Sequence, residues 1–273
     1  MHLMKLIKVI IAAGICACLQ VAFADTKPLV IVAEESPPAT YAEDGKPRGF
    51  DVDIAKAVFD SLGVRYTINI VPWARAWSML KNGQADVGLH VSYTEERAKS
   101  VHWPKNYVWM SHYVFMTNQA TKSAYPLKNV DDVKRSNLLI GIVIDNAYYP
   151  SFWEDFPSPD RGHQHYYVQL NPATDIETNL KKLAADHIQL YPMASILGTY
   201  TSRKMNLNNI TYYDWPLFSK PYPNCFSDAS TYHDATYPDV RALMQAYDRA
   251  LERLKSDKPK FDQYFHQYGV SPD

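Results

Sequence analysis

The chain has 273 residues, with 28 Lys and Arg against 29 Asp and Glu, so its formal net charge at pH 7 is −1. This balance, with no basic stripe along the sequence, excludes nucleic acid as the expected partner. The length is sufficient for one large domain or for two compact lobes, each with its own core.

The first 24 residues have the three parts of a secretory signal peptide. Two lysines precede a short apolar run at 9–19, and Ala22-Phe23-Ala24 then places small residues at a cleavage site. The run is shorter than the ~20 residues that a membrane-spanning helix needs. We therefore predict a cleaved signal peptide at 1–24, with a retained anchor and lipidation at Cys18 as the alternatives.

Cleavage would remove two lysines and two of the three cysteines, so the formal charge would become −3 and Cys225 would remain alone. The mature chain therefore has no internal disulfide, although an exported protein could form one. Its stability must come from its hydrophobic cores. We expect a soluble monomer outside the cytoplasm.

Apolar periodicity predicts alternating strands and helices in the first part of the chain. A continuous apolar run predicts a strand at 29–33 that is covered on both faces. Prolines and a glycine predict a loop at 34–48. The other elements expected here are a helix at 51–62, a strand at 66–71, a helix at 73–81, a strand at 85–91 and a helical turn capped by Thr94.

The alternation continues through the rest of the sequence. The expected strands lie at 109–117, 138–144, 166–170 and 188–191, with an extended segment at 224–230. The expected helices lie at 130–134, 173–185, 240–254 and 261–268. Strands that alternate with helices predict an α/β fold with short loops at the strand ends.

Six short motifs carry a resemblance to a known family. They are Gly-Phe-Asp-Val-Asp-Ile-Ala at 49–55, Val-Pro-Trp-Ala-Arg-Ala at 71–76, Asn-Gly-Gln-Ala-Asp-Val at 82–87, Tyr-Thr-Glu-Glu-Arg at 93–97, Val-Asp-Asp-Val-Lys at 130–134 and Ala-Leu-Glu-Arg-Leu-Lys at 250–255. Each motif is degenerate, but their order and spacing make the set specific. Together they resemble the family 3 periplasmic solute-binding proteins, the receptors of polar amino-acid import systems.

The resemblance implies a two-lobed α/β fold, in which each lobe is a mostly parallel sheet flanked by helices and the chain crosses between the lobes twice. Lobe 1 is expected at 25–108 and 226–273 and lobe 2 at 109–225, with hinges near Val108 and Cys225. It also implies a periplasmic protein that closes around a small polar solute bearing a carboxylate, an amino acid or a related molecule. The partner would be the membrane permease of an ABC importer.

Three residues are expected to hold the carboxylate side of the ligand. By the resemblance, Arg97 grips the carboxylate, because a planar guanidinium can make two parallel hydrogen bonds to it. Ser92 offers a hydroxyl or backbone group to the same carboxylate, and Trp73 forms an aromatic wall at a helix start. The alternatives are a surface Arg97 paired with a neighbouring glutamate, an ordinary strand-end serine and a core tryptophan.

Further ligand contacts are expected from the ends of the first strands. Glu35, and Glu34 beside it, follow the first strand, where family members bind the ligand's side chain. Tyr41 lies in the next loop, and His90 replaces a small polar residue of the amino-acid binders. A structural role remains the alternative for each.

The sequence departs from the amino-acid binders in the second lobe. Where they have a glycine and two hydroxyl residues, this chain has Asp145, Asn146 and, two residues on, Tyr148. Their aspartate for the ligand's ammonium aligns near Met193, and an uncompensated ammonium is costly to bury. We therefore expect that Asp145 substitutes for the missing acid, or that the ligand lacks the amine or is more apolar.

Two other functions remain open. One is an enzyme of dehydratase type on the same scaffold, which would need a cleft acid or base such as Glu35, His90 or Asp145. The other is a soluble partner that reports ligand to a membrane sensor. No cofactor or metal is expected, since no cysteine or acid pair accompanies His163-Gln164-His165 and no phosphate loop or dinucleotide fingerprint is present.

Overall fold

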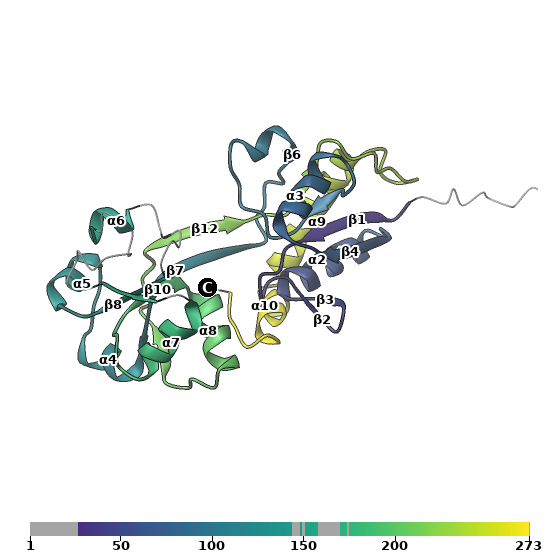
Figure 1. Cartoon of the computed structure of the whole chain (residues 1–273). Helices are drawn as coiled ribbons and strands as arrows, with labels where there is room; N and C mark the ends of the chain where they lie inside the picture. Colours follow the sequence, from purple (N-terminus) through teal and green to yellow (C-terminus); the bar gives the residue numbers. More distant parts are fainter. Residues whose placement is uncertain (1–26, 144–147, 149–150, 158–169, 174, 273) are drawn as a thin grey trace, which may run out of the picture.

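The protein is described by a computed structural model over residues 27–143, 148, 151–157, 170–173 and 175–272. The predicted signal peptide lies outside these residues, as do Asp145, Asn146 and the histidines at 163 and 165. The described chain forms two halves that are joined by two long neighbouring strands (Figure 1).

The first half is built on a five-stranded sheet with the strand order β4-β1-β5-β13-β6. Its strands are β1 (Leu29–Ala33), β4 (Tyr66–Ile70), β5 (Val87–Gly88), β6 (Val101–His102) and β13 (Cys225–Ser227). β1 pairs in parallel with β4 and β5, whereas β13 pairs antiparallel with β5 and β6. β13 arrives from the C-terminal part of the chain, so the two ends of the sequence share one sheet.

Helices cover both faces of this sheet. α2 (Phe50–Ser61), α9 (Val240–Ser256) and α10 (Lys258–His266) share a hydrophobic cluster with Leu29, Ile31 and Ala33 of β1. α3 (Trp73–Lys81) packs on the other face, where Val32 belongs to its cluster. Successive residues of β1 therefore face opposite layers, as a strand's two-residue period requires.

The start of α2 depends on a glycine. Gly49 precedes the helix with a φ of 121°, and a Cβ at this position would lie 2.1 Å from the carbonyl oxygen of Ala39. Only glycine fits this close approach of two backbone segments. The approach is fixed because the backbone N–H of Asp51 donates to the same carbonyl at 3.1 Å. Smaller elements complete this half, namely the hairpin β2 (Tyr41–Glu43) and β3 (Lys46–Arg48), and the 3-10 helix η2 (Arg97–Lys99).

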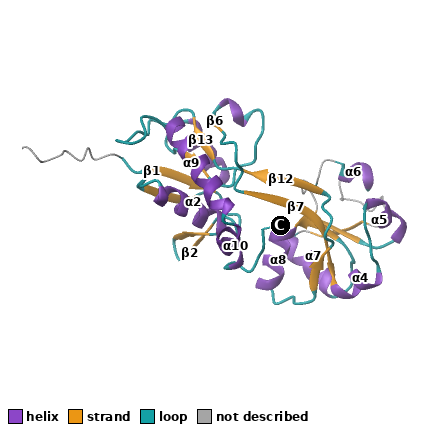
Figure 2. Cartoon of the chain, turned by 180° about the vertical axis from the view of Figure 1, so that it is seen from behind, coloured by secondary structure: helices purple, strands orange, loops and turns teal. Residues whose placement is uncertain are grey.

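The second half is organised around β7 (Trp109–Asn118), which pairs antiparallel with three other strands. These partners are β10 (Tyr191–Ala194), β11 (Ile210–Tyr212) and β12 (Phe218–Tyr222). A parallel pair, β8 (Ile140–Val143) and β9 (Leu170–Ala173), adjoins them through a bridge between Ile140 and Leu190. The helices are α4 (Gln119–Ala124), α5 (Val130–Ser136), α6 (Phe152–Asp155), α7 (Ile176–Ala184) and α8 (Ser195–Lys204) (Figure 2).

The α/β class agrees with the sequence prediction, and several elements differ in detail. Parallel pairing holds for β1 with β4 and β5 and for β8 with β9, whereas every pair made by β7 is antiparallel. The strand expected at 85–91 is regular only at 87–88, because His90 has a φ of 57°. The strand expected at 188–191 lies at 191–194. Most of the strand expected at 166–170 lies outside the described residues, and β9 begins at residue 170. The hairpin β2–β3, β6, α4, α6, α8, β11 and β12 were not predicted.

Candidate functional site

Arg97 is held by stacking and by one backbone carbonyl. Its Cζ lies 4.5 Å from the ring centroid of Trp73 and 5.8 Å from that of Trp77, and these two indoles stack at 5.8 Å. Its Nη1 donates to the carbonyl oxygen of Ser92 at 2.8 Å. Within the described residues Arg97 makes no ion pair, although Glu95 and Glu96 precede it directly. A guanidinium has five N–H donors, so donors remain for a ligand.

Three aromatic rings from different parts of the chain form a stack where the two halves meet. His90 lies against Tyr222 with centroids 4.2 Å apart and an interplanar angle of 6°. Trp109 stacks with Tyr222 at 5.0 Å and with His90 at 5.5 Å. Trp109 begins β7 and Tyr222 ends β12, so both strands that join the halves contribute a ring. His90 belongs to the first half.

A buried polar network holds His90 in place. Asn224, which is fully buried, accepts a hydrogen bond from the backbone N–H of His90 at 3.0 Å. Its Nδ2 donates to Asp51 Oδ1 at 3.2 Å and to the Tyr247 hydroxyl at 2.9 Å. The network therefore ties α2 and α9 to the segment that carries His90, and it accounts for that residue's left-handed backbone.

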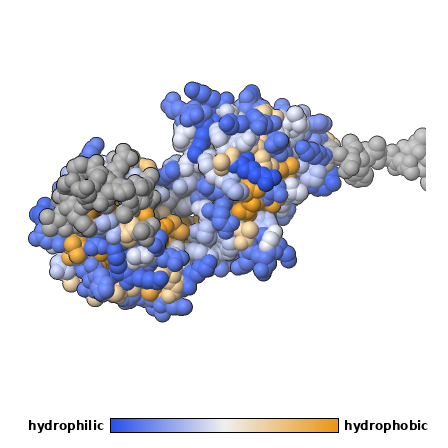
Figure 3. Space-filling model, viewed as in Figure 1, coloured by the Kyte–Doolittle hydropathy of each residue, from blue (hydrophilic) through white to orange (hydrophobic). Residues whose placement is uncertain are grey.

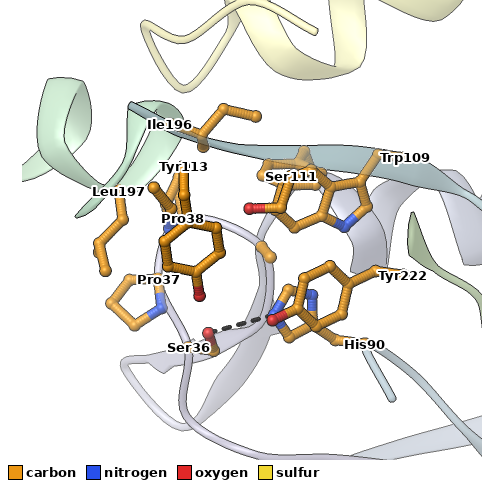
Figure 4. A pocket seen from close by; sticks show the side chains of 13 residues that line it. Ser36, Pro37, Pro38, His90, Trp109, Ser111, Tyr113, Ile196, Leu197 and Tyr222 are labelled. Carbon is orange, nitrogen blue, oxygen red and sulfur yellow. Dashed lines mark hydrogen bonds between the residues drawn. The ribbon is translucent and has the colours of Figure 1, made fainter. Parts of the chain in front are cut away.

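The imidazole of His90 lies between an acid and a hydroxyl. Its Nε2 is 3.4 Å from Ser36 Oγ (Figure 4). Its Nδ1 is 3.8 Å from Asp51 Oδ2. Asp51 Oδ2 and His90 Nδ1 are both buried without a hydrogen-bond partner. The order acid, imidazole and hydroxyl is that of a hydrolytic triad, but 3.8 Å is too long for the hydrogen bond that orients the imidazole in such a site.

A cavity of about 130 Å³ lies beside this stack. The first half lines it with Ser36, Pro37 and His90, the second with Leu197, and the joining strands with Trp109 and Tyr222 (Figure 4). The cavity opens between the two halves, where the molecular surface is indented (Figure 3). Its walls come from both halves, as a site that closes around a small molecule requires.

Lys220 lies beside this cavity, next to Tyr222. Burial raises the pKa of Tyr222 to about 12. Lys220 Nζ lies 5.2 Å from the Tyr222 ring centroid. Burial, and then the positive charge of Arg97, lower the pKa of Lys220 from its ordinary value. Two cations therefore face the same region.

The other predicted residues lie in different surroundings. The carboxylate of Glu35 accepts from the backbone N–H of Ala42 at 3.2 Å and is exposed. Tyr41 packs edge-on against Tyr268 at 6.3 Å, away from Arg97's indoles. Tyr148 stacks on Phe152 at 4.5 Å, and its hydroxyl accepts from the N–H of Val143 at 2.5 Å.

Residue 194, rather than 193, lies at the cavity on strand β10. Met193 is buried, with 5% of its surface exposed, in a hydrophobic cluster of the second half. Its neighbour Ala194 lines the cavity. Near the position expected for the family's aspartate, the side chain at the cavity is therefore the methyl group of Ala194.

Several residues of the site were not found by sequence reasoning. Trp109 and Tyr222 flank the expected hinges, but nothing in their local spacing marks them as a stacked pair. Ser36, Asn224 and Lys220 also lack a local signal. Within the described residues no group of three His, Cys, Asp or Glu side chains is arranged to hold a metal ion.

The comparisons with known proteins decide the family. Residues 29–270 match the model of the bacterial extracellular solute-binding proteins, family 3. The chain belongs to this family. It is therefore a member of a family of extracellular binding proteins, and none of the described helices is both long and apolar enough to cross a bilayer.

The chain is 22% identical over 242 residues to the probable amino-acid-binding protein YxeM of Bacillus subtilis (strain 168), covering 85% of this chain and 81% of that protein. Among solved structures, it resembles the L-cystine solute receptor of Neisseria gonorrhoeae in its unliganded open conformation. The TM-score is 0.70, at 18% identity, covering 92% of this chain and 96% of that one. A histidine kinase sensor domain matches with a TM-score of 0.59 at 18% identity, covering 91% and 99%. The fold is thus that of the two-lobed periplasmic binding proteins, and the two halves are its lobes.

Proposed function

We propose that this protein captures a small solute with a carboxylate between its lobes and delivers it to the permease of an ABC importer. The observation that carries this proposal is that the guanidinium of Arg97 is held in place but has unused hydrogen-bond donors. Its guanidinium is oriented by two indoles and one carbonyl, and it has no carboxylate partner within the described residues. A half-buried arginine with free donors is suited to a carboxylate ligand.

The relatives support an amino acid or a similar molecule as the solute. The YxeM protein of B. subtilis carries the name of a probable amino-acid-binding protein, and the matched N. gonorrhoeae receptor is named for L-cystine. Ser92 and Trp73, both next to Arg97, would complete the carboxylate side of the site. His90 and the cavity beside it would receive the rest of the molecule.

Closure would bring the lobes together about two points. We infer lobe 1 at 25–108 and 226–273, lobe 2 at 109–225, and hinges near Val108 and Cys225. The two connections run side by side there, since the N–H of Val108 donates to the carbonyl of Tyr222 at 3.0 Å. Two adjacent strands that bend together permit a hinge motion without disrupting either core. The protein would act as a periplasmic monomer after removal of residues 1–24.

A thermal-shift panel of carboxylates tests the proposal. A ligand at 100 times its Kd adds about 2.7 kcal/mol of stability. At roughly 2–4 °C per kcal/mol, the melting temperature should rise by roughly 5–10 °C. Arg97→Ala should abolish the rise and leave the unliganded melt almost unchanged. Arg75→Ala is the matched control, because Arg75 is exposed on α3 of the same lobe.

Two results would contradict the proposal. One is a carboxylate whose thermal shift survives in Arg97→Ala at the size seen in the native protein. The other is the absence of any shift across the panel, together with no small molecule released from the purified protein and detected by mass spectrometry. Conversion of a bound acid to product would instead favour the enzymatic alternative.

A further inference from the structure

Lys220 lies on the second joining strand, beside the interlobe cavity. In the antiparallel pair of β7 and β12, Lys220 lies opposite Ser111 and Tyr222 opposite Trp109. Side chains two residues apart on a strand share a face. Ser111, Trp109 and Tyr222 all line the cavity. Lys220 therefore lies on the same face of β12 as Tyr222, next to the cavity lining but not part of it, with its Nζ 5.2 Å from the Tyr222 ring centroid.

Arg97 of the first lobe is linked to Tyr222 through the segment His90–Ser92. The segment His90–Ser92 connects the two cations, because its N-terminal residue stacks on Tyr222 at 4.2 Å and its C-terminal carbonyl accepts from Arg97 Nη1 at 2.8 Å. The N–H of Val91 also donates to the carbonyl of Pro223 at 3.3 Å. The depressed pKa of Lys220, to which the charge of Arg97 contributes after burial, agrees with this proximity.

Neither cation is neutralised within the part of the chain that the structure describes. The ion pairs there join Lys and Arg residues at other positions to acids, and neither Arg97 nor Lys220 takes part in one. Two partly buried like charges destabilise each other and the folded state. The arrangement is suited to a guest that supplies the missing negative charge.

We propose that the solute carries two acidic groups, one bound by Arg97 and the other by Lys220. This inference rests on the proposed function and narrows the solute to a small dicarboxylate, with or without an amine. A single carboxylate would neutralise one cation and leave the other partly buried without a partner, which is costly. Among the described residues, those that line the cavity include no acid.

Matched pairs of ligands test the inference by isothermal titration calorimetry. Each pair has the same shape and differs by one acid replaced by its amide, such as glutarate with glutaramate and L-glutamate with L-glutamine. In the native protein, at least one diacid should bind at least tenfold more tightly than its amide. A hydrogen bond to a charged group supports a difference of this order.

Lys220→Met locates the effect, because it removes the charge and keeps most of the chain length. It should lower the affinity for the diacid to that for the amide and leave the amide's affinity unchanged. Lys99→Met is the control, because this substitution removes the same formal charge. Lys99 is exposed on η2, in the same lobe as Arg97. It should leave both affinities unchanged.

Three results would overturn the inference: amides that bind as tightly as their diacids, a Lys220→Met protein with unchanged diacid affinity, or no heat with any diacid of three to six carbons. In each case the proposed function is judged separately. It stands if a monocarboxylate still gives a thermal shift that Arg97→Ala abolishes, and it fails with the inference if no such ligand exists.

Discussion

Asn224→Leu should destabilise the protein strongly, although the two side chains are similar in size. The leucine fills the space but leaves three buried groups without their partner: the N–H of His90, Oδ1 of Asp51 and the hydroxyl of Tyr247. Asn224, Asp51 and Tyr247 each have 0% of their surface exposed, so water cannot replace the lost bonds.

The expected loss is about 4 kcal/mol, because a buried group left unsatisfied costs roughly 1–3 kcal/mol and the Asp51 carboxylate belongs at the upper end. At roughly 2–4 °C per kcal/mol this lowers the melting temperature by roughly 8–16 °C. Urea unfolding followed by tryptophan fluorescence gives the free energy directly. The slope with denaturant should be unchanged, since the surface exposed on unfolding is the same.

Asn106→Leu is the matched control for this measurement. Asn106 also donates from its side chain to an acid distant in sequence, Asp248, at 3.0 Å, but it is only half-buried. Water can solvate the groups that its loss exposes, so the cost should be below about 1 kcal/mol. If Asn224→Leu and Asn106→Leu destabilise the protein equally, burial of the network around His90 is not what makes it stabilising.

Three further outcomes follow from the structure. Gly49→Ala should lower the free energy of unfolding in urea by more than about 3 kcal/mol, because the new methyl group meets a backbone carbonyl. Gly63→Ala, with a φ of 67° and no heavy atom within 4 Å of the new Cβ, should lower it by only about 1–2 kcal/mol. Equal losses in the two variants would contradict this reasoning. Cys225 should not react with thiol reagents until the protein is unfolded, since burial raises its thiol pKa to about 12, and rapid labelling of the native protein would refute that. The pKa of Lys220 is lower in the folded than in the unfolded state, so the unfolded state binds more protons between the two values and the unliganded protein should gain stability as pH rises through that window. Lys220→Met should remove that gain in melts recorded between pH 8 and about pH 10.4, the ordinary lysine value, and an unchanged pH profile would show that Lys220 is not the group responsible.

The first lobe was predictable from sequence because its elements are locally encoded. β1 and α3 lie at the residues expected, since each is a continuous apolar run or a helix bounded by proline and glycine. The strand at 85–91 failed for a reason that no local pattern reveals. His90 leaves the strand because its N–H bonds to Asn224, 134 residues away.

The second lobe was less predictable because its strands depend on long-range pairing. β12 contains Pro221 and charged Lys220, which argue against a strand in isolation. It forms because it pairs with β7 alone, so no second neighbour requires the missing N–H of the proline. β10 begins three residues later than the apolar run suggested, where pairing with β7 starts, and Leu190 contributes only a bridge.

The candidate site likewise combines residues from locally encoded motifs with residues that only long-range strand pairing brings together. Arg97, Trp73 and Ser92 lie within 25 residues of one another, and they were predicted from local motifs that resemble the family's. Trp109, Tyr222 and Lys220 lie on strands that meet only in the folded chain, and these strands carry the second cation and the aromatic stack. The local motifs therefore identified the arginine proposed to hold one carboxylate, but not the lysine and the aromatic rings on the joining strands.

The charges around the cavity favour a ligand that is net negative. Arg97 and Lys220 contribute two positive charges. The charge of Glu34 contributes, after burial and other causes, to the raised pKa of Tyr222. If Glu34 receives a ligand ammonium, a neutral amino acid still leaves one cation unmatched, whereas an acidic amino acid matches all three groups. Without an ammonium, a dicarboxylate places one acid on each cation, because Glu34 forms an ion pair with neither of them within the described residues. The proposed second acid of the solute therefore follows from pairing each cation separately, and an ion pair between Glu34 and Arg97 or Lys220 would remove the need for it.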